Sequence, residues 1–451
     1  MPKVFITDKS GKKKAVTGSV FQEAFYSGLP QVNVCLNMPR QTMLGFGIAV
    51  TDASCHLLAG LEEDQRARLL GSIFGEGGLG LSIARLSVGA SDYACDLYNY
   101  DDLAGDMELT RFSIEHDRQH ILPILRAINR ICPELFYFSS VWSAPGWMKT
   151  GGSMCGGWLR EEYLEVFARY YTRFLEEYKK EGIDVRALTS QNEPETDQCG
   201  RMPACYLHPE FEQRIVRDHL APILREKGLD TEIWIHDHNF IQWNRAKWML
   251  DDEATKAVVD GVAFHYYEGT ADMATALHEA HPGTAIHWTE GGPNLGDEYE
   301  TDWCYWGRIF TEALNNWCSS ITGWNLALDE KGRPNIGSFS CAGLVTIHSE
   351  TNTVTYSGQY HAFAHFGPFI KRGASQLVTT GPNGQYHHTN RKISLYHTAF
   401  RNPDQSCVLI FTNPDEQQEI SLQIGMRRFR LILPADSLVT MVFEPEELMR
   451  H

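Results

Sequence analysis

Residues 185–195 read VRALTSQNEPE, in which a short alternating apolar run ends in a polar cluster. The apolar part is typical of a strand, and the cluster places Asn192 and Glu193 where that strand ends. The same pattern recurs in runs that begin at Leu44, Leu79, Leu135, Glu232, Gly261, Thr284 and Ile321. Segments with helical spacing usually follow, such as residues 161–181. Eight such alternations predict a (β/α)8 TIM barrel of the α/β class, because no glycine-rich dinucleotide fingerprint follows the first run.

The pattern changes after about residue 360. Segments such as SCVLIFTNP and RFRLILPADSLVTMVFE are short, alternating and bounded by turn residues, which is typical of antiparallel strands. The first 40 residues also lack helical spacing and contain VFITD, KAVTG and VNVCLN. We therefore predict three parts: strands in residues 1–40 that join a β-sandwich, a catalytic barrel in residues 41–360, and a C-terminal β-sandwich in residues 361–451.

Composition limits the possible partners and compartments. The 451 residues include 40 basic and 57 acidic side chains, and a net charge of -17 disfavours nucleic acid. The sequence contains no run of about 18 apolar residues, so we expect no membrane-inserted segment. The N-terminus shows no secretory signal, and 11 scattered cysteines fit reduced thiols. We expect a cytoplasmic protein, or a secreted one whose signal is missing from this sequence; the oligomeric state is left open.

Two glutamates stand at predicted strand ends, Glu193 after the fourth run and Glu290 at the close of the seventh. Both ends open onto the same mouth of a barrel, where reacting groups gather. A pair of carboxylates across a pocket is what glycoside cleavage requires. Each glutamate alone would be read as a solvated loop charge, but the pair favours catalysis. Pro194 predicts an extended backbone for Glu193.

Aromatic residues crowd the same strand ends. Sugar rings have apolar C–H faces, so flat aromatic walls with a few polar groups suit a carbohydrate pocket. Trp142 and Trp324 each lie at a strand terminus, and we predict that both are pocket walls. Trp288 should point away from its inward neighbours and belong to the core.

The run His236, Asp237 and His238 raises the alternative of a zinc site. Strand alternation would place the two histidines on one face and the aspartate on the other. No HExxH motif or cysteine cluster supplies further ligands, so we expect neither a metal nor another cofactor. The sequence also lacks a P-loop and a Gly-x-Ser-x-Gly elbow, which disfavours nucleotide and serine-hydrolase chemistry.

Ordered motifs along most of the chain resemble glycoside hydrolase family 30, a clan A family that includes acid β-glucosidases acting on glucosylceramide. The motifs are GFGIAVTDAS, ARLSVGASDY, SSVWSAPGWMKTGG, SQNEPE, AFHYYEG, HWTEGG, ITGWNLALDEKGRPN and GQYHAFAHFGPFIKRGA. The resemblance implies a (β/α)8 barrel with a side β-sandwich built from both chain ends. It also implies retention of anomeric configuration through double displacement.

The same resemblance assigns roles to particular residues. Glu193 would be the acid/base and Glu290 the nucleophile. The substrate-binding residues would be Asp92, Trp142, Asn192, Tyr267 and Trp324. The supporting residues would be Arg85 and His265.

We therefore expect a retaining, exo-acting β-glucosidase or glucosylceramidase-like enzyme whose partner is a carbohydrate or a glycolipid. The match at Asp92 favours a pocket for a terminal sugar. Gly291 and Gly292 follow Glu290, whereas the family's lysosomal acid β-glucosidase has Ala-Cys at these positions. The resemblance therefore does not predict which aglycone is preferred. Alternatives are a β-xylosidase, a β-fucosidase or an endo-β-1,6-glucanase of the same family, and a carbohydrate-binding protein on an inactive barrel.

Overall fold

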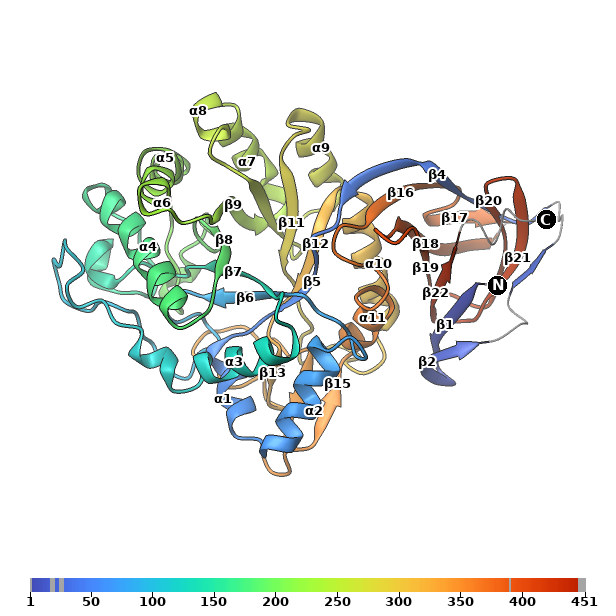
Figure 1. Ribbon diagram of the computed structural model, residues 1–451, viewed down its shortest axis with the longest axis horizontal. Coiled ribbons are helices and arrows are strands. Elements are labelled where there is room, and N and C mark those ends of the chain that lie inside the picture. The colour runs from blue at the N-terminus through green and yellow to red at the C-terminus, as the bar shows by residue number, and fades with distance from the viewer. Residues whose placement is uncertain (1, 17–20, 24–27, 389–390, 445–451) are drawn as a thin grey trace.

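A computed structural model describes residues 2–16, 21–23, 28–388 and 391–444. It consists of a barrel of strands and helices with a β-rich body at its side (Figure 1). The first and last described strands, Lys3–Asp8 and Ser437–Phe443, lie in the β-rich body (Figure 1). No helix in the described ranges is both long enough and apolar enough to cross a membrane.

The barrel closes with parallel strands in the order β10-β11-β12-β5-β6-β7-β8-β9. Their bounds are β5 Gly45–Ala49, β6 Ile83–Ser87, β7 Phe136–Ser140, β8 Val185–Thr189, β9 Glu232–Asn239, β10 Gly261–His265, β11 Ala285–Glu290 and β12 Cys318–Gly323. Each predicted run overlaps one of these strands, so the (β/α)8 prediction is confirmed. The last strand, β12, begins at Cys318, before the run predicted from Ile321.

Helices surround the strands (Figure 1). Their bounds are α1 Asp52–Ala59, α2 Glu63–Phe74, α3 Ile121–Ile131, α4 Leu164–Lys180, α5 Pro209–Arg214, α6 Ala221–Lys227, α7 Trp243–Leu250, α8 Glu253–Lys256, α9 Asp272–Ala280, α10 Trp303–Asn315 and α11 Gly358–Phe366. A π-helical turn, η6 Ile215–Leu220, joins α5 to α6. In α4, the predicted apolar stripe is buried, including Phe167, Tyr170 and Phe174. The stripe docks the helix on the barrel because burial of such side chains stabilises packing.

The lower interior of the barrel is apolar. Ile83, Phe138 and Ala263 belong to a buried cluster there, together with Trp234. The Trp234 ring stacks on that of His287 with centroids 3.9 Å apart. The polar side chains of the barrel interior lie at the carboxyl ends of the strands, where the site described below is found.

The side body is one large mixed sheet with the order β2-β1-β22-β19-β18-β16-β4-β20-β21-β3, to which β17 adds by pairing with β18. Its strands are β1 Lys3–Asp8, β2 Gly11–Val16, β3 Phe21–Glu23, β4 Gln31–Thr42, β16 Ser375–Thr380, β17 Gly384–His388, β18 Arg391–Arg401, β19 Cys407–Asn413, β20 Gln418–Ile424, β21 Arg427–Leu433 and β22 Ser437–Phe443. N-terminal β1 pairs with C-terminal β22, so both chain ends build this body, as predicted. The predicted strand KAVTG extends beyond Val16 into residues that the structure does not describe.

A small third sheet contains β13 Ala327–Leu328, β14 Val345–Ile347 and β15 Val354–Tyr356. β13 follows the last barrel strand, β12, by three residues. Residue 360, the predicted end of the barrel part, lies within α11. In that helix the ring nitrogens of His365 lie 2.8 Å from the hydroxyls of Thr440 in β22 and Thr7 in β1, which fixes α11 to the side body.

Candidate active site

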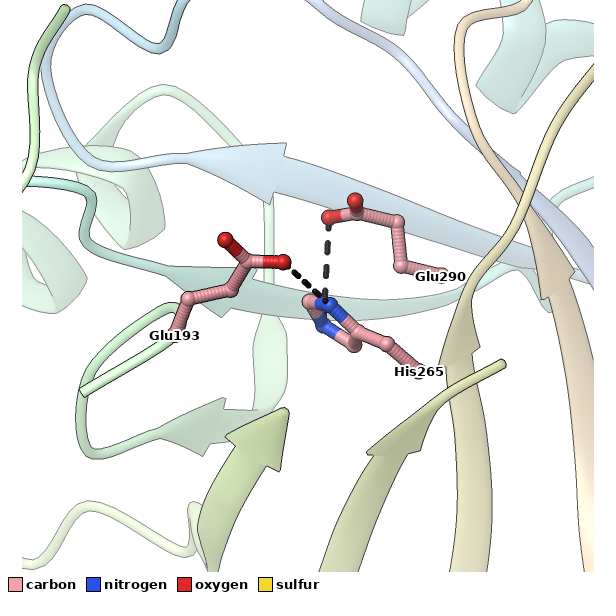
Figure 2. A group of neighbouring side chains, drawn as sticks. All are labelled: Glu193, His265 and Glu290. Carbon is pink, nitrogen blue, oxygen red and sulfur yellow. Dashed lines mark hydrogen bonds and ion pairs between the residues drawn. The ribbon is translucent and has the colours of Figure 1, made fainter. Parts of the chain in front are cut away.

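The two predicted glutamates meet at the carboxyl end of the barrel. Glu193 lies in the loop after β8, and Glu290 is the last residue of β11. One carboxylate oxygen from each and a ring nitrogen of His265 all lie within 4.8 Å of one another (Figure 2). The two glutamates line a cavity of about 470 Å³. This separation is in the range of the close carboxylate pairs of retaining glycosidases, about 5 Å.

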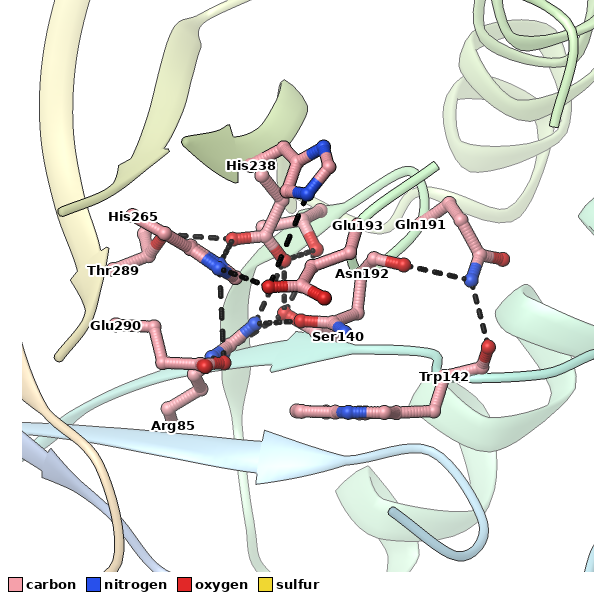
Figure 3. A network of polar contacts seen from close by, with 12 residues as sticks. Arg85, Ser140, Trp142, Gln191, Asn192, Glu193, His238, His265, Thr289 and Glu290 are labelled. Carbon is pink, nitrogen blue, oxygen red and sulfur yellow. Dashed lines mark hydrogen bonds and ion pairs between the residues drawn. The ribbon is translucent and has the colours of Figure 1, made fainter. Parts of the chain in front are cut away.

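Arg85 lies beneath the pair and is fully buried. Its Nη1 donates to Glu290, and its Nη2 donates to Asn192 Oδ1 and Asp237 Oδ2, each at 2.8 Å (Figure 3). Burial acts to lower the pKa of Arg85, but the charges of Asp237 and Glu290 outweigh it and raise the pKa. The guanidinium therefore stays charged and holds the Glu290 side chain in position.

Asp237 anchors this network from the end of β9. Besides Arg85, its carboxylate accepts hydrogen bonds from Ser140, Thr189 and Thr289 at 2.8, 2.6 and 2.7 Å. Burial acts to raise the pKa of Asp237, but the charge of Arg85, the hydrogen bond and charge of His265, and the hydrogen bond from Thr189 hold it well below its usual range. A buried anion with this many donors is a fixed counter-charge for Arg85.

The alternation assumed for residues 236–238 is wrong. His236 and Asp237 have φ values of 79° and 47°, and the register between β9 and β10 shifts at this point. His236 turns its ring to Phe264, with centroids 5.1 Å apart, whereas Asp237 reaches the polar network. His238 lines the cavity, 4.0 Å from Glu193 Oε1. The bulge re-aims the strand end, as bulges next to active sites often do.

His265, at the end of β10, bridges the acidic groups. Its Nδ1 lies 3.2 Å from Glu193 Oε1, and its Nε2 lies 3.8 Å from Glu290 Oε2 (Figure 2). The same Nε2 lies 3.1 Å from Asp237 Oδ1. Burial acts to lower the pKa of His265, but Glu290, Asp237 and Glu193 raise it to about 9. The ring is thus an imidazolium near neutrality.

Glu193 has a left-handed backbone with φ 45°, so the predicted extended conformation is wrong. Its N–H donates to Asp237 O at 3.0 Å, and this bond fixes the turn that aims the side chain at the cavity. Gln198 Nε2 donates to Glu193 Oε2 at 2.9 Å. Burial acts to raise the pKa of Glu193, but the hydrogen bond from His265 and the charges of His238 and His265 bring it below its usual value.

The predicted aromatic walls are in place. Trp142 and Trp324 are buried, line the cavity and stack with centroids 5.3 Å apart at 20°. The Arg85 guanidinium lies 4.8 Å from the Trp142 ring centroid. Trp288 is fully buried in the core, as predicted.

The other predicted residues also reach the cavity. Tyr267 donates its phenol to Glu290 Oε1 at 3.0 Å. Asp92 lines the cavity at 3% exposure, and its Oδ1 has no hydrogen-bond partner among the described residues. Asn192 lines it as well, next to Glu193. The structure therefore brings together every residue predicted for the site.

Several residues of the site were missed by the sequence reasoning: Asp237 in the buried network, His238 and Gln198 near the carboxylates, and Met202 and Phe339 in the cavity wall. The position of Asp237 at the end of the fifth run is a signal that could have found it. Gln198 and Met202 lie in an irregular loop, where no periodicity predicts a direction.

Two matches with known family models complete this picture. Residues 43–370 match the glycosyl hydrolase family 30 TIM-barrel domain, and residues 385–441 match the glycosyl hydrolase family 30 beta sandwich domain. The chain belongs to glycoside hydrolase family 30. It is therefore a glycoside hydrolase with a retaining family mechanism, and the resemblance seen in the motifs is confirmed.

Relatives of this family 30 enzyme include proteins with two different named activities. An endo-1,6-beta-D-glucanase of Neurospora crassa is 33% identical over 356 residues, which cover 76% of this chain and 73% of the relative. A putative glucosylceramidase 1 of Caenorhabditis elegans is 29% identical over 83% of this chain and 74% of the relative. A solved endo-beta1,6-glucanase has a TM-score of 0.87 at 27% identity and covers 98% of this chain and 99% of its own.

Proposed function

We propose that this family 30 enzyme hydrolyses β-glucosidic bonds and that β-1,6-linked glucan is its main substrate. The glutamate pair across the cavity carries the reaction, because oxygens within 4.8 Å leave no room for the extra water of an inverting mechanism. The named activity of the Neurospora crassa relative supports the glucan substrate. Glucosylceramide is the second candidate, on the strength of the name of the Caenorhabditis elegans relative.

In the first step, Glu290 attacks the anomeric carbon of the sugar. Arg85 and Tyr267 donate hydrogen bonds to its carboxylate, which orient it toward the cavity. Glu193 gives its proton to the departing glycosidic oxygen as the C–O bond breaks. The sugar is then bound to Glu290 as an ester, and the aglycone leaves with the proton.

In the second step, Glu193 takes a proton from a water molecule, which attacks the anomeric carbon and releases Glu290 as a carboxylate. Two displacements restore the original anomeric configuration. His265 supports both steps because its positively charged ring lies between the two carboxylates and offsets part of their negative charge. Asp237 holds His265 and Arg85 in place.

We further propose that a terminal sugar enters the cavity at Asp92, hence exo action. The carboxyl group of Asp92 is nearly completely buried at the cavity wall, beside Trp142 and Trp324. The loop around Phe339 closes over this end: Tyr93 donates its phenol to Phe339 O at 3.1 Å, and Ile336 N donates to Asp92 O at 2.8 Å. A buried carboxyl group with a free oxygen suits the hydroxyls of a chain end.

Initial rates on matched aryl glycosides test the reaction. We expect the β-glucoside to react faster than the β-xyloside, β-fucoside and β-galactoside. Glu290→Ala should lose several orders of magnitude in kcat, since a covalent nucleophile is removed. Glu300→Gln, at an exposed position outside the cavity, is the matched control. A loss below about tenfold for Glu290→Ala would exclude the assigned role.

A leaving-group comparison tests Glu193. Glu193→Gln should slow cleavage of a β-1,6-glucan far more than that of a dinitrophenyl glucoside, whose leaving group needs no proton. Equal losses on both substrates would assign Glu193 a different role.

Product sizes from a β-1,6-glucan decide between exo and endo action. Early release of glucose or of one fixed small product supports a chain-end pocket, whereas early oligosaccharides of mixed length would assign endo action instead. Glucosylceramide is assayed in parallel; turnover of the lipid above that of the glucan would replace the glucan as main substrate.

A further inference from the structure

Lys149 is a buried cation to which the proposed hydrolysis assigns no role. It lies between β7 and α4 and is 2% exposed. Its Nζ donates to Ser143 Oγ at 2.7 Å, to Met154 O at 2.8 Å and to Ala204 O at 2.6 Å. Ala204 N also donates to Met154 O at 3.2 Å. All three N–H donors of the ammonium are therefore used, and each acceptor is an uncharged oxygen.

The three bonds tie two loops to the end of a barrel strand. One bond stays within the loop of residues 149–159, which we call the Lys149 loop. A second reaches the loop of residues 196–206, the Gln198 loop, which follows Glu193. The third reaches Ser143, just after β7. Burial lowers the pKa of Lys149 to about 8, so below that pH the amine is protonated and keeps all three donors.

The Gln198 loop contains a strained turn. Gln198, Cys199 and Gly200 have φ values of 50°, 52° and 68°. Two consecutive left-handed residues other than glycine are unfavourable, and such a conformation persists only where neighbouring contacts hold it. The turn rests on Gly156 of the Lys149 loop, where a Cβ atom would lie 2.7 Å from Gly200 Cα. The two loops therefore pack backbone against backbone at this point.

The strained turn aims Gln198 at the acid/base. Gln198 Nε2 donates to Glu193 Oε2 at 2.9 Å, while Glu193 Oε1 lies 3.2 Å from His265 Nδ1. An amide donor favours the ionised carboxylate and restrains the orientation of its oxygens. Proton donation depends on that orientation, because the acid must reach the departing glycosidic oxygen. The position of the turn thus bears on the step that we propose for Glu193.

We propose that Lys149 is a positioning residue for the acid/base: it holds the Gln198 loop so that Gln198 stays bonded to Glu193. The inference rests on the proposed hydrolysis. Lys149 is not among the residues that line the catalytic cavity, so it acts through the loop and not on the sugar. Loss of Lys149 should therefore have the same effect as loss of Gln198, and it should affect proton transfer more than the other parts of the reaction.

The ratio of two rates tests this assignment. Lys149→Met and Gln198→Met should each lower kcat/KM for a β-1,6-glucan about tenfold, the value of one hydrogen bond to a charged group. For a dinitrophenyl glucoside, whose leaving group needs no proton, we expect a loss below about threefold. Loss of folded protein would lower both rates alike and leave their ratio unchanged. Lys179→Met, at an exposed position in α4, is the matched control and should keep both rates.

The pH profile gives a second readout. Burial acts to raise the pKa of Glu193, whereas His265, His238 and Gln198 lower it. When the amide donor is lost or displaced, this pKa rises, so the alkaline limb of kcat/KM should move to higher pH in Gln198→Met and in Lys149→Met alike. The double variant Lys149→Met/Gln198→Met should have the same rate ratio as Gln198→Met, because Lys149 acts through Gln198.

A second variant reaches the same turn without touching the ammonium. If Lys149→Met does not fold, Gly156→Ala takes its place, because the added methyl group pushes on Gly200, and we expect the same change in the rate ratio. An unchanged ratio in the folded variant, or a larger change in the double variant than in Gln198→Met, would overturn the proposal. A wild type that cleaves neither substrate contradicts the proposed function and this inference with it. Wild-type turnover with unchanged ratios in the variants contradicts this inference alone.

Discussion

A buried ion pair behind the acid/base loop gives the sharpest test of how the scaffold positions Glu193. Arg245 in α7 donates from Nε and Nη2 to Glu212 Oε2 in α5, at 2.8 and 2.7 Å. The two side chains are 2% and 0% exposed. Glu212 Oε1 also accepts from Ser190 Oγ at 2.5 Å and from His236 N at 3.0 Å. The pair therefore joins the SQNEPE run to the bulge of β9 that orients Asp237.

The contacts of Arg245 and Glu212 determine how much stability Arg245→Met should lose. Removal of one partner of a buried ion pair costs about 3–5 kcal/mol, because the other charge is left uncompensated. Glu212 would keep its bonds from Ser190 and His236, so we expect the lower end, about 3 kcal/mol. At roughly 2 °C per kcal/mol for a large domain, the Tm should fall by about 6 °C. The double variant Arg245→Met/Glu212→Gln removes both charges and should regain about half of that loss.

Thermal unfolding of the two single variants and the double variant gives the coupling energy directly. Cleavage of a β-1,6-glucan should fall more than cleavage of a dinitrophenyl glucoside in Arg245→Met, because a displaced Glu193 chiefly affects proton donation. The reasoning is refuted if the Tm of Arg245→Met falls by less than about 2 °C. It is also refuted if the double variant is no more stable than Arg245→Met.

Three further predictions follow from single groups. Asp92→Ala should lower kcat/KM for an aryl β-glucoside roughly 10- to 100-fold, which corresponds to the free energy of one hydrogen bond to a charged or buried group. An unchanged kcat/KM would contradict a contact between Asp92 and the sugar. Activity should have an acidic optimum, because kcat/KM falls as pH rises through the lowered pKa of Glu193. His265→Gln removes a cation that lowers this pKa, so the alkaline limb should move to higher pH; a flat profile between roughly pH 4 and 9 in wild type would contradict this account. Burial raises the pKa of Asp117 to about 6 in the folded protein, whereas an aspartate in the unfolded chain has a pKa of roughly 3.9. Asp117 therefore stabilises the fold at low pH, and this stabilisation is lost as the pH rises through about 6. Asp117→Asn should therefore gain Tm relative to wild type from pH 5 to pH 7.5, and an equal difference at both pH values would contradict the assigned pKa.

The barrel could be predicted from sequence because its signals are local. Each strand is a short apolar run, and Glu193 and Glu290 directly follow two such runs. Parallel strands in a closed barrel place all their carboxyl ends on one side, so position along the strand was enough to bring these residues together. Trp142 and Trp324 were predictable for the same reason.

Features that depend on non-local contacts could not be predicted. Asp237 reaches the site through a bulge, and simple alternation gave it the wrong direction. Glu193 precedes a proline yet adopts φ 45°, because a backbone bond to Asp237 O stabilises the turn. Arg245 and Glu212 are 33 residues apart and meet only because their two helices pack over the same strand ends.

The buried charges of the site support the acid role that we propose for Glu193. Arg85 and His265 carry positive charge, while Asp237, Glu290 and Glu193 together carry one negative charge more when all are ionised. In the open cavity, water and the histidines stabilise that excess charge, and the pKa of Glu193 lies below its usual value. A bound sugar expels this water and makes an uncompensated buried charge costly. A proton on Glu193 restores neutrality, since Asp237 and Glu290 are already held by Arg85. The substrate itself thus favours the protonated state of Glu193 that the first step requires.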